Sequence, residues 1–296
     1  MDAERSVFAG RNLIVAFEGW NDAAEAASGV VKLIAEQISG EVVGALDPED
    51  YFDFQFNRPV VSYDETGNRQ FTWPGADFFE ASADSKAENP ALANLFVLVG
   101  VEPSRRWRAF VAELIEVIQD LEIDAVIFLG AMLADQPHTR PILVMSTSQN
   151  ERVRRELDVE KSQYEGPVGI LSVLGQSLED IGIPTIALWA QVPHYVHQQP
   201  APKATLSLLG EVEQLIGISF EHGSLGEEAF AWERGIDDVA ANDEEMANYI
   251  QQLEQTRDEY ASEAASGDAL AREFERFLKS EEKREKPQDS DEPDDK

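Results

Sequence analysis

Residues that could do chemistry follow the apolar runs of this sequence, at the points where strands would end. The first such stretch, Phe17-Glu-Gly-Trp-Asn-Asp-Ala23, places Gly19, Trp20 and Asn21 between an expected strand and an expected helix. Parallel sheets bind ligands at the carboxyl ends of their strands, and the free amides of a helix start favour an anion there. The two carboxylates of the stretch would repel a phosphate, however. A tight turn that caps a helix is therefore the favoured interpretation.

Glu102 stands at the end of a second apolar run, in Gly100-Val-Glu-Pro103, and Gly130-Ala-Met132 ends a third in the same way. A carboxylate at the edge of a sheet can serve as a general base. It can equally cap a helix or pair with a nearby cation such as Arg105 or Arg106. The structural role is the favoured interpretation for Glu102.

Three of the four histidines also lie in such positions. Pro137-His-Thr-Arg-Pro141 contains His138 and Arg140, and Ser146-Thr-Ser148 follows it as part of the same polar loop. These groups could bind an anion or transfer a proton. Trp189-Ala-Gln-Val-Pro-His-Tyr-Val-His197 adds two more histidines, which with His138 could form a zinc site. Packed histidines are favoured over a metal site, because a lone His-x-x-His is a weak signal.

Together these positions define a candidate strand-end cleft for which we predict no catalytic residue, no metal and no cofactor. Its members are Gly19, Trp20, Asn21, Glu102, His138, Arg140, Trp189 and His194.

The elements that must position the cleft alternate between strands and helices. Apolar runs predict strands at residues 12–17, 41–46, 94–99, 125–129, 168–172 and 184–189, several of them apolar on both faces. Helical periodicity predicts helices at 22–38, 104–121, 176–181 and 204–216. This alternation predicts an α/β fold, a three-layer sandwich with a mostly parallel sheet. Residues 48–90, rich in aromatics and turn residues, predict a hairpin or an extension of the sheet.

The C-terminal part has a different pattern. Met246, Ile250, Leu253 and Tyr260 follow a spacing of four and three residues, which predicts a helix with a narrow apolar seam. Leu270, Phe274 and Phe277 continue the pattern after Gly267. The seam either packs on the chain's own core or contacts a neighbouring subunit. We treat it as a candidate oligomer seam.

The composition excludes several classes of protein. The 296 residues contain 57 acidic and 24 basic side chains, for a formal net charge of −33. So few cations argue against binding to nucleic acid or to an anionic membrane. The chain has no cysteine, which fits a reducing compartment. No apolar run approaches the roughly 20 residues that span a bilayer. With no export signal apparent near the start, we expect a cytoplasmic protein.

We predict three regions from these patterns. Residues 1–220 form the α/β domain, residues 221–279 form a helical region, and residues 280–296 form an acidic tail without enough apolar residues to fold.

The same stretches, in this order, resemble one family. FEGWNDAAEAA, FTWPGADFFE, LVGVEPSRRWRAFVAE, HTRPILVMSTS, YEGPVGILSVLGQ and GIPTIALWAQVPHYVHQQPAPKATLSLLGEVEQL look like the proteasome assembly chaperone 2 family in its actinobacterial form. The resemblance covers roughly residues 10–218. It implies a three-layer α/β fold like that of nucleoside phosphorylases and peptidyl-tRNA hydrolases, with an added C-terminal helical region.

The resemblance also implies a function. It implies protein assembly without established catalysis, a homo-oligomer with a trimer as the working expectation, and proteasome α-subunits as the candidate client. The family's eukaryotic chaperones dock through a C-terminal hydrophobic-Tyr-any tail. This sequence ends in Pro293-Asp-Asp-Lys296, so we do not expect that mode of docking.

Three functions remain open at this stage. The favoured one is a non-catalytic interaction or assembly factor with a protein partner. The alternative is a small-molecule binder or a phosphorylase-like or hydrolase-like enzyme that uses the strand-end cleft. The third is a structural homo-oligomer without a client. The sequence leans against an enzyme.

Overall fold

The computed structural model describes residues 6–64, 66–196 and 200–264 of the chain. The chain divides into two compact units, residues 1–242 and residues 243–296, which are described separately. The first unit contains all the predicted cleft residues.

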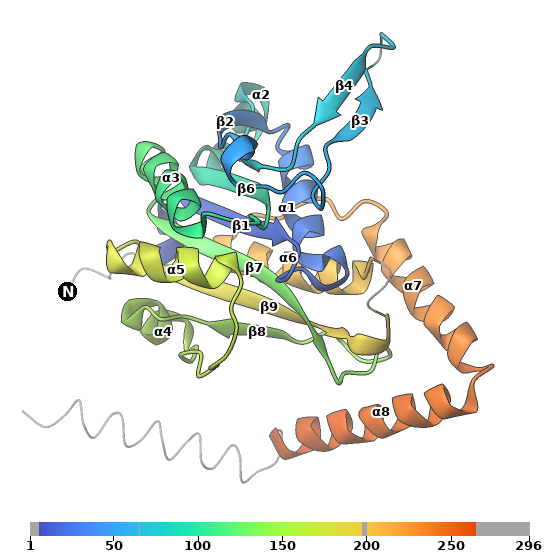
Figure 1. Ribbon diagram of the computed structural model, residues 1–296. Coiled ribbons are helices and arrows are strands. Elements are labelled where there is room, and N and C mark those ends of the chain that lie inside the picture. Colours follow the sequence, from blue (N-terminus) through green and yellow to red (C-terminus); the bar gives the residue numbers. More distant parts are fainter. Residues whose placement is uncertain (1–5, 65, 197–199, 265–296) are drawn as a thin grey trace, which may run out of the picture. The chain divides into compact units, whose positions relative to one another are not determined.

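A seven-stranded sheet forms the centre of the first unit, in the order β2-β5-β6-β1-β7-β9-β8 (Figure 1). β1 pairs in parallel with β6 and β7, and β7 pairs in parallel with β9. Antiparallel strands complete both edges. The strands are β1 (Asn12–Glu18), β2 (Glu41–Ala45), β5 (Ala76–Glu80), β6 (Leu95–Val101), β7 (Ala125–Ala134), β8 (Val144–Thr147) and β9 (Thr185–Pro193).

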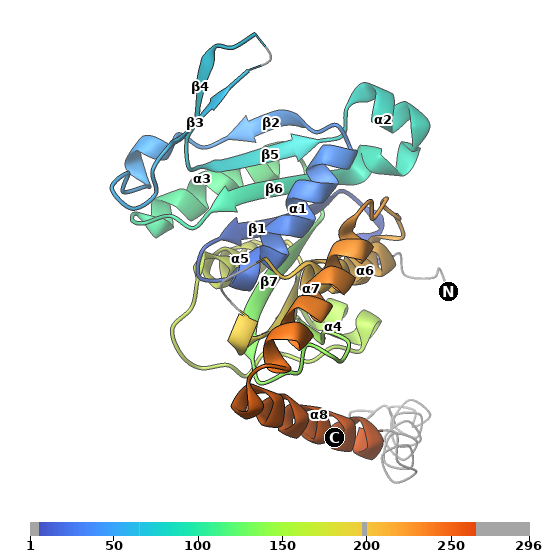
Figure 2. The same ribbon diagram turned by 90° about the vertical axis from the view of Figure 1, so that its right-hand side faces the viewer.

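Helices cover both faces of this sheet (Figure 2). α1 (Ala26–Gln37) and α6 (Pro202–Ile216) contribute to one apolar cluster, while α3 (Trp107–Asp120) and α5 (Ile170–Asp180) contribute to the other. The predicted three-layer α/β sandwich with a mostly parallel sheet is therefore confirmed. The short helices are α2 (Ala83–Glu88) and α4 (Glu151–Leu157), with 3₁₀ turns η1 (Val7–Ala9), η2 (Ala23–Glu25), η3 (Pro48–Asp50), η4 (Pro90–Asn94) and η5 (His194–Val196).

The turn after β1 begins α1 in the way its sequence suggests. Asp22 lies four residues before the helix, and its Oδ1 accepts hydrogen bonds from the amides of Ala27 (2.8 Å) and Ser28 (3.2 Å). Ala24 and Glu25 have left-handed backbone conformations, with φ of 54° and 56°, which bend the chain back over the carboxylate. Burial raises the pKa of Asp22 above its ordinary value, although these hydrogen bonds oppose the shift. The predicted capping turn is the local structure observed.

One predicted strand is wrong. Residues 168–172 were expected to be a strand, but α5 begins at Ile170. Ile170, Leu171 and Leu174 are all buried, and their spacing fits one face of a helix as well as it fits a short buried strand. The helix predicted at 176–181 is thus the second half of α5. Ser146 and Thr147, expected in a polar loop, belong to the edge strand β8 instead.

The region at residues 48–90 combines both predicted alternatives. β3 (Val60–Tyr63) and β4 (Arg69–Thr72) form a separate hairpin that extends away from the main sheet (Figures 1 and 2). β5 then pairs between β2 and β6, which extends the sheet.

The C-terminal helical extension begins with α7 (Leu225–Ala240), which contributes Leu225 to the cluster of α1 and α6. The first unit therefore continues to residue 242, past the boundary expected at residue 220. α8 (Glu244–Ala264) belongs to the second unit and carries the predicted seam, with Ile250 and Leu253 buried and Tyr260 exposed. The seam residues after Gly267 and the predicted tail at 280–296 lie outside the described residues. None of the described helices is long and apolar enough to cross a membrane.

Candidate functional site

Glu102 caps a helix at the carboxyl edge of the sheet. It follows β6, and its Oε1 accepts a hydrogen bond of 2.8 Å from the backbone amide of Ile170, the first residue of α5. Its own amide donates to the carbonyl of Glu18 at the end of β1 (2.9 Å). A carboxylate at a helix start satisfies a free amide and interacts favourably with the helix dipole. The structure thus gives this carboxylate the structural role that the sequence favoured.

Gly19 and Asn21 lie beside the same helix start. A side chain at Gly19 would begin 3.3 Å from the Cβ of Glu102, and Gly19 itself has φ of +118°. A Cβ at Gly169, the residue before α5, would lie 2.1 Å from the side-chain nitrogen of Asn21. The backbone oxygen of Asn21 accepts from the amide of Ala131 in β7 (2.8 Å). Glycine at residue 169 therefore permits the close approach of the β1 turn to α5.

Asn21 carries an unusual group in this position. Its side chain is buried, with 4 % of the residue exposed, and its Nδ2 donor has no hydrogen-bond partner among the described residues. Buried amide donors are nearly always paired, by protein or by ordered water. The Nδ2 of Asn21 can therefore donate a hydrogen bond that no described residue accepts.

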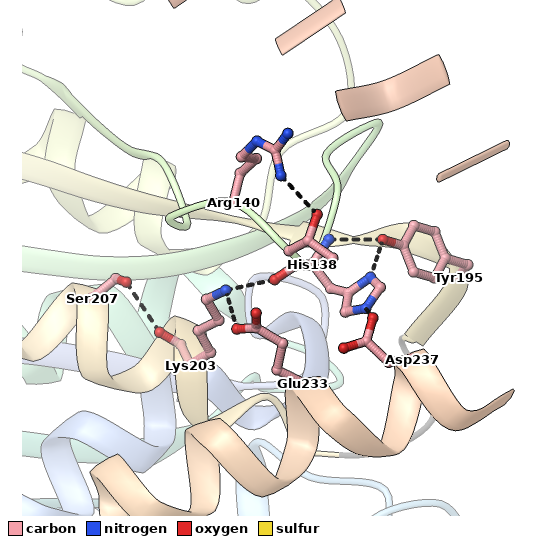
Figure 3. A network of polar contacts seen from close by, with 8 residues as sticks. His138, Arg140, Tyr195, Lys203, Ser207, Glu233 and Asp237 are labelled. Atoms are coloured by element: carbon pink, nitrogen blue, oxygen red, sulfur yellow. Dashed lines mark hydrogen bonds and ion pairs between the residues drawn. The ribbon is translucent and has the colours of Figure 1, made fainter. Parts of the chain in front are cut away.

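His138 forms a second polar centre, in the loop after β7. Its imidazole lies between the hydroxyl of Tyr195 and the carboxylate of Asp237, while Arg140 extends away from it (Figure 3). His138 Nδ1 is 2.9 Å from the Tyr195 oxygen, and Nε2 is 3.1 Å from Asp237 Oδ1. The backbone amide of His138 also donates to the Tyr195 oxygen, at 2.8 Å. The side chain of His138 is fully buried, so every polar atom of the ring needs a partner, and each has one.

The hydrogen-bond pattern fits a neutral imidazole. The Tyr195 oxygen accepts from the His138 amide, its hydroxyl donates to Nδ1, and Nε2–H then donates to the Asp237 carboxylate. Burial lowers the pKa of His138 from its ordinary value, although Asp237 and Glu233 oppose this shift. Nearby Lys203 lowers the pKa further. The site is thus built to hold an uncharged histidine at neutral pH.

Lys203 connects the histidine loop to two helices. From α6, its ammonium donates to the backbone oxygen of His138 and to Glu233 of α7 (Figure 3). Trp232 of α7 adds a ring contact, with its centroid 6.4 Å from that of His138. Through these contacts the loop after β7 is joined to α6 and α7. The arrangement holds a helix against the sandwich, and we refer to its members, His138, Tyr195, Lys203, Glu233 and Asp237, as the His138 clamp.

The four remaining predicted cleft residues are Trp20, Arg140, Trp189 and His194. Trp20 is largely exposed, and the ring of Trp189 lies over Gly130 of the neighbouring strand, where a Cβ would meet it at 2.5 Å. His194 contacts Asp135, with Nδ1 3.3 Å from Oδ1, and its ring stacks edge-on with Tyr195. Arg140 Nη1 donates to Thr139 Oγ1 at 3.4 Å. The structure brings Gly19, Asn21 and Glu102 together at α5, and His138 and His194 together around Tyr195. That all eight residues form one cleft remains a prediction.

His138, His194 and His197 are the histidines that could have formed a metal site. Over residues 6–64, 66–196 and 200–264, no group of three or more His, Cys, Asp or Glu side chains is arranged to hold a metal ion. His197 lies outside the described residues.

Sequence reasoning missed the partners that complete each centre. Tyr195 lies between His194 and His197, and its residue type alone did not indicate a contact with His138. Asp237 is 99 residues from His138 and on a helix assigned to another domain. One local pattern does indicate that α7 is packed. Trp232, Glu233 and Ile236 have helical spacing on a helix with an apolar face, which predicts that this helix packs against another element of the fold.

The fold defines the class of this protein, a three-layer α/β sandwich. Residues at the strand ends of its sheet form hydrogen bonds to helices of the same chain. Comparison with known proteins makes this specific. A family model described as the PAC2 family matches residues 16–240. The chain belongs to the PAC2 family.

Two solved structures from actinobacteria support this assignment. A PAC2 family protein from Streptomyces avermitilis is 42 % identical, with a TM-score of 0.71, over 81 % of this chain and 99 % of that one. A Mycobacterium tuberculosis proteasome-assembly chaperone homologue is 38 % identical, with a TM-score of 0.70 and the same coverage. A Pyrococcus furiosus archaeal proteasome activator, 14 % identical with a TM-score of 0.59 over 80 % of this chain and 96 % of that one, shares the fold. No curated protein matches the chain.

Proposed function

We propose that this chain is a non-catalytic assembly factor that binds a protein partner in the cytoplasm. The observation that carries the proposal is its 38 % identity to a Mycobacterium tuberculosis proteasome-assembly chaperone homologue, over nearly the whole of that chain. Proteasome α-subunits are therefore the first client to test.

The contacts at the strand ends support this role. Glu102 and His138 are the groups best suited by type to general acid–base chemistry. Glu102 is engaged by the start of α5, and His138 is held between Tyr195 and Asp237. Both side chains therefore have structural roles, and such roles favour a protein that acts by binding a partner over one that acts by acid–base catalysis.

Net charge supports the role as well. A formal charge of −33 keeps a chain soluble while it exposes apolar residues for a partner. Exposed apolar patches of appreciable size mark interaction surfaces in proteins.

An affinity capture tests the proposal. Tagged full-length chain is incubated with lysate of its own organism, and bound proteins are quantified by mass spectrometry against a tag-only control. We expect stoichiometric enrichment of proteasome α-subunits, confirmed by binding to the purified subunits. Recovery of the bait alone would contradict the proposal.

A second function is favoured by one observation, the unpartnered amide of Asn21. A buried donor at the carboxyl edge of a sheet is what a small ligand with an acceptor oxygen would use. Thermal-shift measurements with nucleosides, phosphate and small amides test this alternative. A stabilisation present in the wild type and absent in Asn21→Ala would favour a small-molecule binder, and no shift with any compound would count against it.

A further inference from the structure

The exposed apolar side chains of the chain are concentrated around the β3–β4 hairpin. Among the described residues, sixteen large apolar side chains are exposed to solvent, and seven of them lie between residues 42 and 73. They are Val42, Phe56, Val60, Val61, Tyr63, Phe71 and Trp73. The hairpin extends away from the main sheet, and every residue of β3 and β4 is exposed (Figures 1 and 2). Apolar side chains that gather on one part of a surface mark a binding site for another molecule.

An open hollow of about 400 Å³ lies at the base of this hairpin, beside the end of β2. It is lined by Ala45, Leu46, Asp47, Pro48, Glu49 and Trp73. Leu46 is buried, and its amide donates to the carbonyl of Ala76 in β5 (3.1 Å). The hollow is therefore attached to the main sheet.

Trp73 provides the aromatic wall of the hollow. It follows β4 directly, and its ring packs edge-on against Phe54, with the ring centroids 5.0 Å apart. Phe54 in turn packs against the apolar cluster of α3 and α5. Half of Trp73 is nevertheless exposed. The indole is therefore held in place by the fold and still has surface available to a ligand.

Asp47 and Glu49 provide the charge of the hollow. Both residues are exposed, and Asp47 Oδ1 accepts a hydrogen bond from the Glu49 amide (2.9 Å) at the start of η3. Among the described residues, no cation pairs with either carboxylate. The next acidic residue, Asp50, differs in this respect because Arg106 pairs with it. The hollow therefore carries two negative charges that the described part of the chain does not neutralise.

Other arginines of this region are already engaged. Arg105 donates to the carbonyl of Phe52 (2.6 Å), and the Arg69 guanidinium lies over the Phe71 ring, 5.4 Å from its centroid. These contacts leave the carboxylates of the hollow without a cationic partner among the described residues. A cation bound there would come from another molecule.

The composition of the hollow favours an arginine side chain. A guanidinium stacks on an indole, donates several N–H groups to carboxylates and stays charged at neutral pH. A phosphate or a carboxylate would be repelled by the two acidic side chains. Arginine and aromatic residues are enriched at the centres of protein interfaces. The net charge of −33 also attracts a partner whose binding surface is basic.

We propose that this hollow binds an arginine side chain of a protein partner, while exposed apolar side chains of the hairpin pack beside it. The inference rests on the proposed function for the source of the arginine. It adds the surface that meets the partner and the chemistry that the partner presents.

Fluorine NMR of the full-length chain tests the proposal. Labelling with 5-fluorotryptophan gives one signal for each of the five tryptophans, and Trp73→Phe identifies the signal of Trp73. The probe is the peptide Ac-Leu-Arg-Leu-NH2, and its control is Ac-Leu-Cit-Leu-NH2, in which citrulline has the shape of arginine without its charge. We expect the arginine peptide to shift the Trp73 signal and the citrulline peptide to bind about fivefold or more weakly.

Variants of the two carboxylates separate the hollow from the general acidity of the chain. Asp47→Asn with Glu49→Gln removes both charges, and the Asn side chain keeps an acceptor for the amide of residue 49. This double variant is expected to bind the arginine peptide about fivefold or more weakly than the wild type. Asp84→Asn with Glu88→Gln removes two exposed charges from α2 and is the matched control, expected to bind like the wild type. Circular dichroism melting of each variant verifies that the fold is retained.

The outcomes distinguish this proposal from the proposed function. Equal binding of the two peptides, or equal effects of the two double variants, would overturn it. So would a Trp73 signal that moves with the concentration of the chain but not with the peptide, which would place a second copy in the hollow. Because the peptide experiment needs no client, its failure leaves the proposed function standing, and failure to capture α-subunits leaves the peptide result unchanged.

Discussion

His138 is a fully buried histidine with three defined hydrogen-bond partners, Tyr195, Asp237 and Lys203. The His138 ring uses both nitrogens, and its backbone amide and carbonyl bond Tyr195 and Lys203. Removal of one partner would leave a buried polar atom unsatisfied, which costs about 1–3 kcal/mol. These contacts give His138 a structural role in joining the loop after β7 to α6 and α7.

His138 makes the stability of the fold depend on pH. Its pKa lies below the ordinary value of 6.5 in the folded chain, so the unfolded chain takes up the proton first as the pH falls. The stabilisation is complete above about pH 6.5 and is lost from there down toward the folded pKa, by at most about 1.4 kcal/mol per pH unit. We expect urea unfolding at several pH values between 7 and 5 to show this loss. His138→Gln should flatten it.

The control for this experiment is a histidine in a different setting. His222 is 43 % exposed and contacts Glu213 at the surface, so His222→Gln checks whether a change of slope is specific to the buried histidine. Equal slopes for the wild type and His138→Gln would show that the pH dependence arises elsewhere.

Glu102 gives a second prediction at this scale. Glu102→Ala removes the acceptor for the Ile170 amide and should destabilise the chain by about 1 kcal/mol, the usual value of a helix cap. Glu102→Gln keeps an acceptor oxygen and should lose less. Urea unfolding by circular dichroism measures both variants. A loss of stability in the Gln variant as large as in the Ala variant would show that charge, rather than the hydrogen bond, stabilises α5.

The sequence could identify these residues but not their partners. Residue type and position after an apolar run were enough to single out Glu102 and His138. Their roles depend on Ile170 and Asp237, which are 68 and 99 residues away. The residues that neighbour Glu102 and His138 in the sequence do not indicate these distant partners.

At the scale of elements, α7 combines an apolar face with specific polar contacts to the sandwich. Leu225, Ala229, Ile236 and Ala240 are its buried residues. Leu225 and Ala240 lie at its ends, and in its middle Ile236 is buried and Trp232 packs against the apolar cluster of α1 and α6. The contacts of Glu233 with Lys203 and of Asp237 with His138 anchor that middle part.

Loss of Lys203 should therefore loosen α7 locally. Lys203→Met leaves Glu233 and the His138 carbonyl without their shared donor, at a cost of about 1–2 kcal/mol. Hydrogen exchange by mass spectrometry should become faster in residues 225–240 and stay unchanged in β1 and β7. Lys32→Met is the control, since the Lys32–Glu18 pair is about half exposed and such pairs contribute little. Uniform acceleration across the chain would contradict a local role.

The elements themselves were largely predictable, and the exceptions have physical reasons. The strands at the centre of the sheet are buried on both faces, so their apolar runs are unambiguous. The first turn of α5 is also a short apolar run, and it forms a helix because Glu102 and Gly169 provide its start. β8, Val-Met-Ser-Thr, is a short edge strand of mixed composition, and its place is fixed by pairing with β9 rather than by an apolar pattern of its own.

At the scale of the whole molecule, α8 carries the candidate oligomer seam. The seam residues Met246, Ile250, Leu253 and Tyr260 belong to the second unit. The apolar core belongs almost entirely to the first unit. Among the described residues, Ile250 and Leu253 are the buried apolar side chains beyond residue 242.

A chain that ends at Asn242 tests the candidate oligomer seam. Since it retains both apolar clusters and the His138 clamp, we expect its melting temperature to stay within about 3 °C of the full chain, a change of no more than about 1 kcal/mol. If the seam on α8 joins copies of the chain, sedimentation velocity should show a lower solution mass for the shortened chain than for the full chain. A shortened chain that keeps both its melting temperature and its state of association would contradict the oligomer seam and give Ile250 and Leu253 an intramolecular role.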